Sequence, residues 1–511
     1  MPMRTERSIK NLAVSLFAQI LNILLQFVLR TIFIKVLSTE YLGLNGLFSN
    51  ILSYLSFAEL GFGAAITFSL YRPLAENDYT TVAGIMYYYK KVYYFVGCFV
   101  LIVGTALTPL LPNLISEMPN IPNIYFIYVL WVINSGLSYF WVYKSTLIIA
   151  DQRKDIVEKN NVVFKLLQLF FQAAILFLTH NYILYLLVQI IVTVLCNMSI
   201  SIIADRRYPY LKKLKNETIN DEVHREIKKN VSATILHKVG AVVIFGTDNI
   251  LLSKFFGLII VGVYSNYYLI INTLSLLTGQ IQASIVASVG NLGVTESTEK
   301  KLYVFQRYLF INFWFFCFTS SCLLSLLNPF VKMWIGVNFL LPYNVVSILV
   351  VNYFLTGFRS AAATFNNAFG LFWNTRKLPV VESVLNILLS IVFSHYFGYI
   401  GVFIGTTISS LITGIWYEPY VLYKVAFNMS PKNYYLRVIE YFSVAAICSL
   451  TSLVIIKFID IDGIIGIIVK FIVAGIVPNV MMLIIYYKTM RFEYFKNYLY
   501  KILNLGKIQK Q

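Results

Sequence analysis

The chain has 511 residues, 58% of them hydrophobic and 13% charged, and its mean hydropathy is +0.72. This composition excludes a soluble enzyme. The net charge of +18 would suggest a nucleic-acid partner in a soluble protein. Here the basic residues lie between apolar blocks, so membrane topology and anionic lipid headgroups explain the charge, and no nucleic acid is expected to bind.

Apolar runs long enough to cross a bilayer, about 20 residues each, recur along the whole chain. They predict an all-α polytopic membrane protein with about 14 transmembrane helices. The first run is too long for a signal peptide and is expected to remain as a span. In chain order the predicted spans are 9–34, 44–70, 92–112, 123–149, 161–179, 182–204, 230–252, 259–288, 305–327, 341–369, 379–395, 399–423, 437–457 and 464–487.

The basic residues are divided unequally between the two sides of the membrane. With this set of spans, 31 lie on the side of the N-terminus, and four lie opposite: Lys35, Lys254, Lys332 and Lys457. The positive-inside rule therefore predicts that both termini are cytoplasmic. Segments 216–229 and 491–505 each place apolar residues on one face and are predicted to be helices on the inner leaflet.

The basic segment 205–229 separates the first twelve spans into two sets of six. It predicts an N-lobe (1–204, helices 1–6), a cytoplasmic basic linker with an amphipathic helix (205–229), a C-lobe (230–424, helices 7–12) and a final part with helices 13–14 and a basic cytoplasmic tail (425–511). Lys35 and Gly43 have the same spacing as Lys254 and Gly262. Such matches suggest a parallel pseudo-repeat of the two lobes, although chance could also produce them.

Polar residues follow one face of four predicted spans. Because polar groups facing lipid are costly, each stripe must face either other helices, through hydrogen bonds, or a water-filled cavity. Two stripes in each half suggest one shared cavity. The stripes are Ser15, Gln19, Asn22, Gln26 and Arg30 in the first span; Asn45, Ser49, Ser56, Glu59, Gly63 and Thr67 in the second; Asn230, Thr234, His237, Lys238 and Asp248 in the seventh; and Asn352, Thr356, Arg359 and Asn366 in the tenth.

Depth in the membrane separates the charged candidates. Glu59, Lys238 and Arg359 lie too far from either interface to reach it easily, whereas Arg30 and Asp248 lie nearer the outer ends, where a side chain reaching the interface is an equal alternative. Side chains near the inner ends are expected to reach water: Lys144, Glu382, Glu418 and Glu440.

The deep charges carry a cationic surplus that suits an anionic substrate such as a phosphate or pyrophosphate, whereas a cavity for organic cations should be acidic. The alternative for Arg359 is a buried pair with a carboxylate such as Glu59. The sequence has no phosphate-binding G-x-x-x-x-G-K-[ST] loop, and its five cysteines and four histidines have no metal-ligand spacing, so no metal site or disulfide framework is expected.

Several segments resemble the Wzx-type polysaccharide (lipid-linked oligosaccharide) flippases of the multidrug/oligosaccharidyl-lipid/polysaccharide exporter (MOP) superfamily. They are residues 30–44 with AELGFGAA at 58–65, TDNILLS at 247–253, GVY at 262–264, and GYIGVFIGTT at 398–407. The likeness covers spans 1 to 12. The fourteen predicted spans depart from the twelve often drawn for this group, and in this respect the chain is similar to the lipid II flippases.

The resemblance implies two six-helix lobes that work by alternating access, in a bacterial plasma membrane, on undecaprenyl-pyrophosphate-linked oligosaccharide for capsule or O-antigen synthesis. It implies a transporter and not an enzyme, with H⁺ or Na⁺ as coupling ion and no other cofactor. Polysaccharide polymerase and glycosyltransferases are the implied protein partners. In this mechanism Arg30, Lys238 and Arg359 attract the pyrophosphate, Gln19, Asn22, Gln26 and Asn352 contact the sugars, and Glu59 and Asp248 bind the coupling ion.

Three alternatives remain at this point. Two are exporters of the same fold, for lipid II or for drugs and cations, and the cationic cavity argues against the second. The third is an integral membrane polymerase or glycosyltransferase, which would need paired catalytic groups at an outer loop or interface. The longest polar outer loop, about residues 113–122, carries only Glu117.

Overall fold

The structure is a computed structural model that describes residues 2–59, 62–214, 224–225, 227, 246–459, 461, 463–489 and 492–493. These residues are nearly all helical, and we see no β-strand among them, which confirms the predicted fold class. The predicted surface helices 216–229 and 491–505 lie largely outside the described residues.

Twelve helical segments of the described chain are long and apolar enough to cross a membrane. Several exceed the predicted spans, because a helix can continue beyond the hydrocarbon core into the polar interface. α11 and α12 have 38 residues each, or about 57 Å at ~1.5 Å per residue. The segments are α1 (Pro2–Val36), α4 (Tyr79–Ala106), α6 (Ile124–Ala150), α7 (Lys154–Thr179), α8 (Tyr182–Arg207), α11 (Leu258–Thr295), α12 (Thr298–Ile335), α13 (Tyr343–Ala368), α15 (Leu378–Phe397), α16 (Ile400–Ile412) continued by α17 (Gly414–Val421), α18 (Lys432–Lys457) and α19 (Gly463–Tyr486).

The second and seventh predicted spans are absent from this set for different reasons. The second consists of α2 (Thr39–Leu55), the 3₁₀ turn η1 (Ser56–Glu59) and α3 (Phe62–Glu76), and each piece is too short to span alone. The second span is therefore interrupted at Ser56–Glu59, and the residues of its predicted polar stripe are divided between α2, η1 and α3. Most of the seventh span lies outside the described residues, which resume at residue 246 as a helix.

The helices expose apolar side chains and bury polar ones, as a lipid solvent requires. On α19, Ile465 and Ile484 are 71% and 72% exposed. In contrast, Gln172 and Asn386 are fully buried. Gln172 donates to the Tyr185 carbonyl oxygen at 3.3 Å, and Asn386 donates to the Thr406 hydroxyl at 2.9 Å. Hydrogen bonds between helices thus pair the side-chain N–H donors of both amides, which lipid could not.

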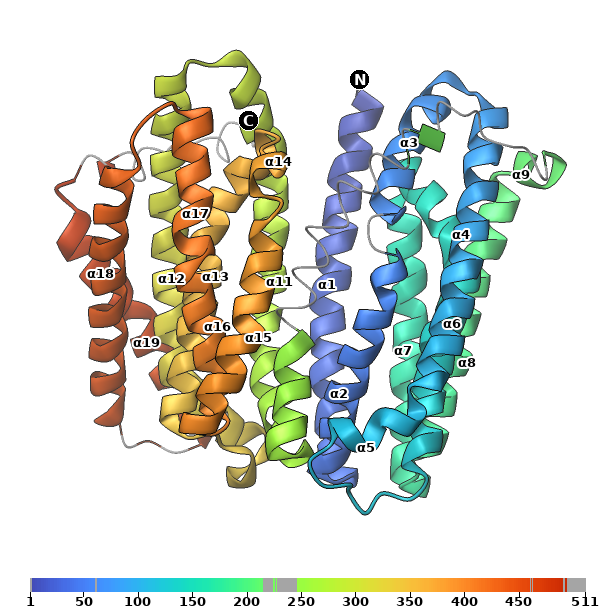
Figure 1. The fold of residues 1–511 in the computed structure, drawn as a ribbon, viewed down its shortest axis with the longest axis horizontal. Helices are drawn as coiled ribbons and strands as arrows, with labels where there is room; N and C mark the ends of the chain where they lie inside the picture. Colours follow the sequence, from blue (N-terminus) through green and yellow to red (C-terminus); the bar gives the residue numbers. More distant parts are fainter. Residues whose placement is uncertain are drawn as a thin grey trace. The chain divides into compact units, whose positions relative to one another are not determined.

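The chain divides into two compact units, Met1–Gly262 and Val263–Gln511. Figure 1 shows each as a bundle of roughly parallel helices. The sequence places the lobe boundary in 205–229 instead. The two differ because residues 246–262 pack on α2: a Cβ on Gly43 would lie 2.1 Å from the Leu258 carbonyl oxygen, and one on Gly262 would lie 2.4 Å from that of Thr39. The contact is reciprocal, since each glycine meets the residue four positions before the other.

In unit 1, α6 packs on α4 and α8, and α7 packs on α1 and α8. In unit 2, α12 is the central helix and contacts α13, α18 and α19, while α15 packs closely on α16. The last two helices are attached through aromatic contacts. The Phe313 ring of α12 stacks on Tyr441 of α18 with centroids 4.1 Å apart, and Trp314 donates to the Asn479 side chain of α19 at 2.7 Å.

Candidate functional site

The polar stripe of the first span lies on α1, which packs on α7. Gln19 and Asn22 are half-buried and Gln26 is exposed. Arg30 is half-buried and interacts electrostatically with Tyr185 of α8. The other side of the helix is apolar and exposed, and consists of Phe17, Ile20, Leu24 and Val28. The polar stripe is therefore turned away from the surface that suits lipid.

Glu59 lies at the end of the turn η1, within a cluster of phenol hydroxyls in unit 1. It accepts a hydrogen bond from Tyr93 of α4. Tyr139 of α6 donates to the Ser56 hydroxyl at 3.1 Å, and the rings of Tyr89 and Tyr93 meet edge-on at 4.3 Å between centroids. A phenol O–H is a neutral donor, so Tyr93 holds the Glu59 carboxyl group without supplying a charge.

Asp248 is buried in the described part of the seventh span. This segment is attached to α2 in unit 1. Asn50 donates to the Gly246 carbonyl oxygen at 2.9 Å, and the hydroxyls of Tyr54 and Thr247 share a hydrogen bond of 2.8 Å. Both predicted ion-coupling residues, Glu59 and Asp248, therefore belong to unit 1. Lys238, the cationic candidate of the same span, lies outside the described residues.

Arg359 of α13 lies in an ion cluster inside unit 2, which we call the Arg359 cluster: Arg359, Glu382 of α15 and Glu418 of α17. The guanidinium donates to Glu418 through Nη2 at 3.0 Å and Nε at 3.4 Å, and to Glu382 through Nη1 at 2.6 Å. The exposed fractions of the three side chains are 19%, 12% and 3%, in the order Arg359, Glu418, Glu382. The buried pair that the sequence offered as an alternative is thus present, with partners other than Glu59.

A break in the twelfth span makes room for this cluster. α16 ends at Ile412, and α17 begins at Gly414 after Thr413 leaves helical geometry with φ −113° and ψ −83°. A Cβ on Gly414 would lie 2.2 Å from the Arg359 Cζ atom, so the guanidinium occupies the space of the absent side chain. Asn366 of α13 donates to the Glu418 carbonyl oxygen at 3.0 Å and ties α17 to α13.

The prediction that Glu382 and Glu418 reach water was wrong, because Arg359 supplies a buried counter-charge that their depth alone does not reveal. Lys144, expected to behave similarly, forms a half-buried ion pair with Asp205 of α8 at 2.6 Å. Glu440 is exposed, as expected.

Asn352 connects two helices with both ends of its amide. Its Nδ2 donates to the Phe403 carbonyl oxygen at 3.0 Å, and its Oδ1 accepts from the Thr407 hydroxyl at 2.6 Å. These bonds join α13 to α16 and match the structural interpretation of a polar stripe. A contact between Asn352 and sugars stays a prediction.

No protein-family model and no curated protein matches the sequence, but solved structures match the fold. Lipid II flippase MurJ, in an inward closed conformation, is 16% identical with a TM-score of 0.64, over 94% of this chain and 99% of MurJ. An inward-facing MATE family multidrug resistance transporter of the MOP superfamily is 14% identical with a TM-score of 0.62, over 80% and 97%. A mutant of the Vibrio cholerae MATE transporter VcmN is 12% identical with a TM-score of 0.54, over 84% and 100%. The chain has the same fold as these proteins.

At these identities the likeness shows the fold alone. The matched proteins are flippases and transporters, and none is named as an enzyme. Among the described residues we find no group of three or more histidine, cysteine, aspartate or glutamate side chains that could hold a metal ion.

Sequence reasoning missed a polar stripe on α15, although its signal was visible. Glu382, Asn386, Ser390 and Ser394 recur at every fourth position and are all buried. Ser390 donates to the Val402 carbonyl oxygen at 2.9 Å, and a Cβ on Gly405 would lie 2.4 Å from the Ser390 backbone nitrogen. The stripe marks close packing of α15 on α16, with the Arg359 cluster at the end where Glu382 lies.

Proposed function

We propose that this chain is a flippase that moves undecaprenyl-pyrophosphate-linked oligosaccharide repeat units across the bacterial plasma membrane for cell-surface polysaccharide biosynthesis, by ion-coupled alternating access. The observation that carries the proposal is the extent of the match to MurJ, which covers 94% of this chain, against 80% and 84% for the two MATE transporters. The fold is therefore shared over more of its length with a protein named for a lipid-linked substrate.

The cationic side chains support an anionic substrate. Arg30 and Lys238 are the proposed attractants for the pyrophosphate, and Gln19, Asn22 and Gln26 are the proposed contacts for the sugars. Arg359 already pairs with two carboxylates, and this geometry favours a structural role in unit 2. Mutation of Arg359 tests whether it also contacts the substrate. These residues do not favour an organic-cation substrate, which would need an acidic site.

Glu59 is the proposed coupling residue, with Asp248 as the second candidate. A driving ion must bind the two conformations with different affinity. The helix break around Glu59 gives a physical means for this, because a change in the break alters the distance to Tyr93 and with it the free energy of the charged carboxylate. H⁺ and Na⁺ are both compatible with a carboxylate among hydroxyl oxygens.

The test is deletion of the gene in the cell that encodes it. We expect loss of surface polysaccharide, accumulation of lipid-linked repeat units on the inner leaflet, and restoration of both by the intact gene. Genes for glycosyltransferases or a polysaccharide polymerase beside it would agree with this. Rescue of cells depleted of MurJ, with unchanged surface polysaccharide in the deletion, would overturn the proposal in favour of lipid II. Altered drug resistance alone would favour a drug exporter.

A further inference from the structure

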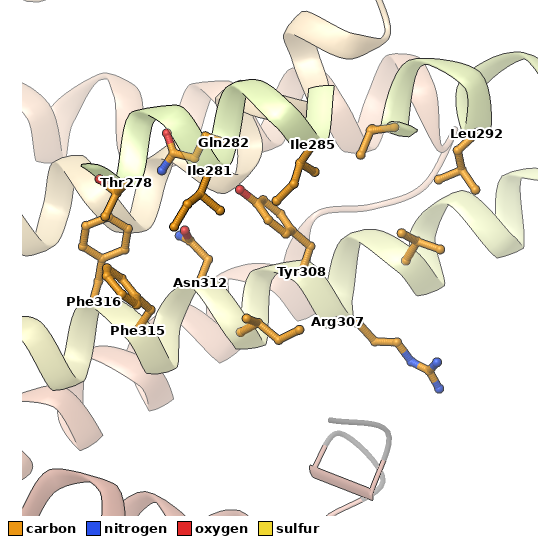
Figure 2. A pocket seen from close by; sticks show the side chains of 13 residues that line it. Thr278, Ile281, Gln282, Ile285, Leu292, Arg307, Tyr308, Asn312, Phe315 and Phe316 are labelled. Atoms are coloured by element: carbon orange, nitrogen blue, oxygen red, sulfur yellow. The ribbon is translucent and has the colours of Figure 1, made fainter. Parts of the chain in front are cut away.

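A cavity of about 650 Å³ lies between α11 and α12 in unit 2. Figure 2 shows Ile281 and Ile285 of α11 pointing toward Tyr308 and Asn312 of α12. Its volume is within the range of ~300–1,000 Å³ that is common for ligand sites. On α12 its lining extends from Val304 to Phe316, or about 18 Å of the ~30 Å hydrocarbon core.

The polar side chains in this wall already make hydrogen bonds to the protein. Gln282 donates to the Ser360 hydroxyl at 2.7 Å, and Asn312 donates to the Gly357 carbonyl oxygen at 2.8 Å. The rest of the wall is mainly hydrocarbon, contributed by Ile281, Ile285, Val289, Leu292, Val304, Ile311, Phe315 and Phe316. A hydrocarbon chain therefore fits the cavity better than a sugar, which needs unpaired donors and acceptors.

The inner end of this cavity is next to a basic site. A second cavity of about 280 Å³ is lined by Gly290 and Gly293 of α11 and Lys301 of α12, together with Ala368, Phe369, Leu371, Val425 and Ala426. Lys301 precedes the lining residue Val304 by one helical turn. Arg307 lines the first cavity itself, but its guanidinium lies 3.3 Å from the centre of the Tyr303 ring and points away from α11 in Figure 2. Lys301 is thus the cation that directly lines the adjoining space.

We propose that the groove between α11 and α12 holds the part of a polyprenyl phosphate's hydrocarbon tail that is next to the phosphate, with the phosphate beside Lys301 at the inner leaflet. The inference rests on the proposed function, because it assigns the place where the lipid part of that substrate binds. The mainly hydrocarbon wall suits a polyprenyl chain, and the lysine that lines the second cavity suits its phosphate. The phosphate end lies on the side that the positive-inside rule assigns to the cytoplasm.

The test uses the full chain in vesicles of phosphatidylethanolamine and phosphatidylglycerol, with undecaprenyl phosphate that carries a photoactivatable diazirine in its tail. We expect the label in peptides that cover 278–292 and 304–316, and we expect unlabelled undecaprenyl phosphate to reduce it several-fold. Absence of label there would overturn the proposal. So would equal labelling by a diazirine phosphatidylglycerol without competition, which would indicate ordinary surrounding lipid.

Two pairs of variants locate the site. Ile285→Trp fills the groove and should lower the labelling, whereas Ile439→Trp changes a side chain of α18 that is 66% exposed and should not. Lys301→Gln should also lower it, whereas Lys300→Gln, whose lysine pairs with Glu296 at 2.6 Å, should not. If Ile285→Trp fails to fold, Ile281→Trp replaces it, because Ile281 is 58% exposed. Equal labelling in each pair would overturn the assignment.

Translocation of lipid-linked oligosaccharide, measured separately in cells, keeps this inference distinct from the proposed function. Export that persists while the groove takes no label would refute the groove alone. Specific labelling in a protein that does not export oligosaccharide would refute the proposed function and leave the lipid site standing.

Discussion

Each unit has a carboxylate next to a break in a membrane-spanning helix, but the two carboxylates are held by different kinds of hydrogen-bond donor. In unit 1, Glu59 lies in the turn between α2 and α3 and accepts a hydrogen bond from a phenol, Tyr93. In unit 2, Glu418 follows the break between α16 and α17 and is gripped by the guanidinium of Arg359. A phenol brings no charge, whereas arginine stays charged at any working pH.

The difference indicates what each break can do. A carboxylate held by a neutral donor can gain or lose a proton or a cation as its surroundings change, which suits a coupling site. A carboxylate held by arginine is fixed in its charged form and suits a joint between helices. The Arg359 cluster also has two carboxylates for one cation, and Glu382 Oε2 is buried without a hydrogen-bond partner among the described residues. Removal of the negative charge on Glu382 is therefore expected to be tolerated better than removal of Arg359.

Arg359→Ala should have the largest effect. It leaves two buried carboxylates without their cation, which typically costs about 3–5 kcal/mol, so the amount of protein in the membrane should fall steeply. Glu382→Gln in the same chain should restore part of it, because one of the two uncompensated charges is removed. Immunoblots of membrane fractions measure both, with Lys377→Ala, at an exposed lysine near the same end of α15, as the control.

The same variants separate a joint from a substrate site. Normal abundance of Arg359→Ala with lost export would show that Arg359 acts on the substrate and would contradict the comparison. In that case Arg359→Lys should keep part of the export, since lysine retains the positive charge but lacks the two parallel N–H donors of the guanidinium. Normal abundance with normal export would refute both roles.

Gly414→Ala should have the second largest effect. The new Cβ would lie 2.2 Å from Arg359 Cζ, so the guanidinium must move from its carboxylates, and overpacking of this kind costs about 1–3 kcal/mol. Thermal unfolding in detergent measures the loss. Gly279→Ala in α11 is the matched control, because a Cβ there meets nothing within 4 Å. Equal unfolding temperatures for the two variants would mean that the break accommodates the methyl group and does not position Arg359.

The sequence was sufficient for the all-helical type of fold and for twelve of the fourteen predicted spans, because an apolar run of about 20 residues is a local property. It was not sufficient for the break at Ser56–Glu59, since 44–70 keeps a helical pattern of apolar and polar residues throughout and contains no proline. The ion-pair partners of Arg359 could not be predicted from the sequence either. Helical periodicity identifies the face on which a residue lies, but not the neighbouring helix that this face meets, and depth alone assigned Glu382 to water.

Glu59→Gln should change transport while leaving the fold nearly intact. The amide oxygen can still accept from Tyr93, so the loss of stability should be about 1 kcal/mol or less, with near-normal abundance. Transport should lose its dependence on pH or on sodium, because the glutamine neither titrates nor attracts a cation. Glu76→Gln, at an exposed pair with Arg72 on α3, is the control and should retain that dependence.

If Glu59→Gln leaves both export and its ion dependence unchanged, Glu59 is a packed, hydrogen-bonded residue. Asp248→Asn would then be the next variant to measure. If abundance collapses as in Arg359→Ala, the carboxylate charge of Glu59 is part of the fold, and the distinction between the two breaks disappears.

Asp78 offers the smallest and most local test of how hydroxyl donors hold a carboxylate, at a site outside the membrane-spanning segments. It caps α4 in the turn after α3, and hydrogen bonds from the hydroxyls of Thr80 and Thr81, together with the Thr81 N–H, lower the pKa of Asp78 to about 2. The unfolded pKa of Asp78 is about 3.9, so the stability from this cap is complete above that pH and is lost as the pH falls through about 2.

Asp78→Ala should cost about 1 kcal/mol near neutral pH, and added salt should reduce the difference. Asp78→Asn, which caps as well, should match the parent near neutral pH and lose the acid-dependent part of the thermal unfolding curve. If the acid-dependent part of the unfolding curve is unchanged in Asp78→Asn, hydroxyl donors do not hold the Asp78 carboxylate in its charged form. That result would also weaken the same argument for Glu59.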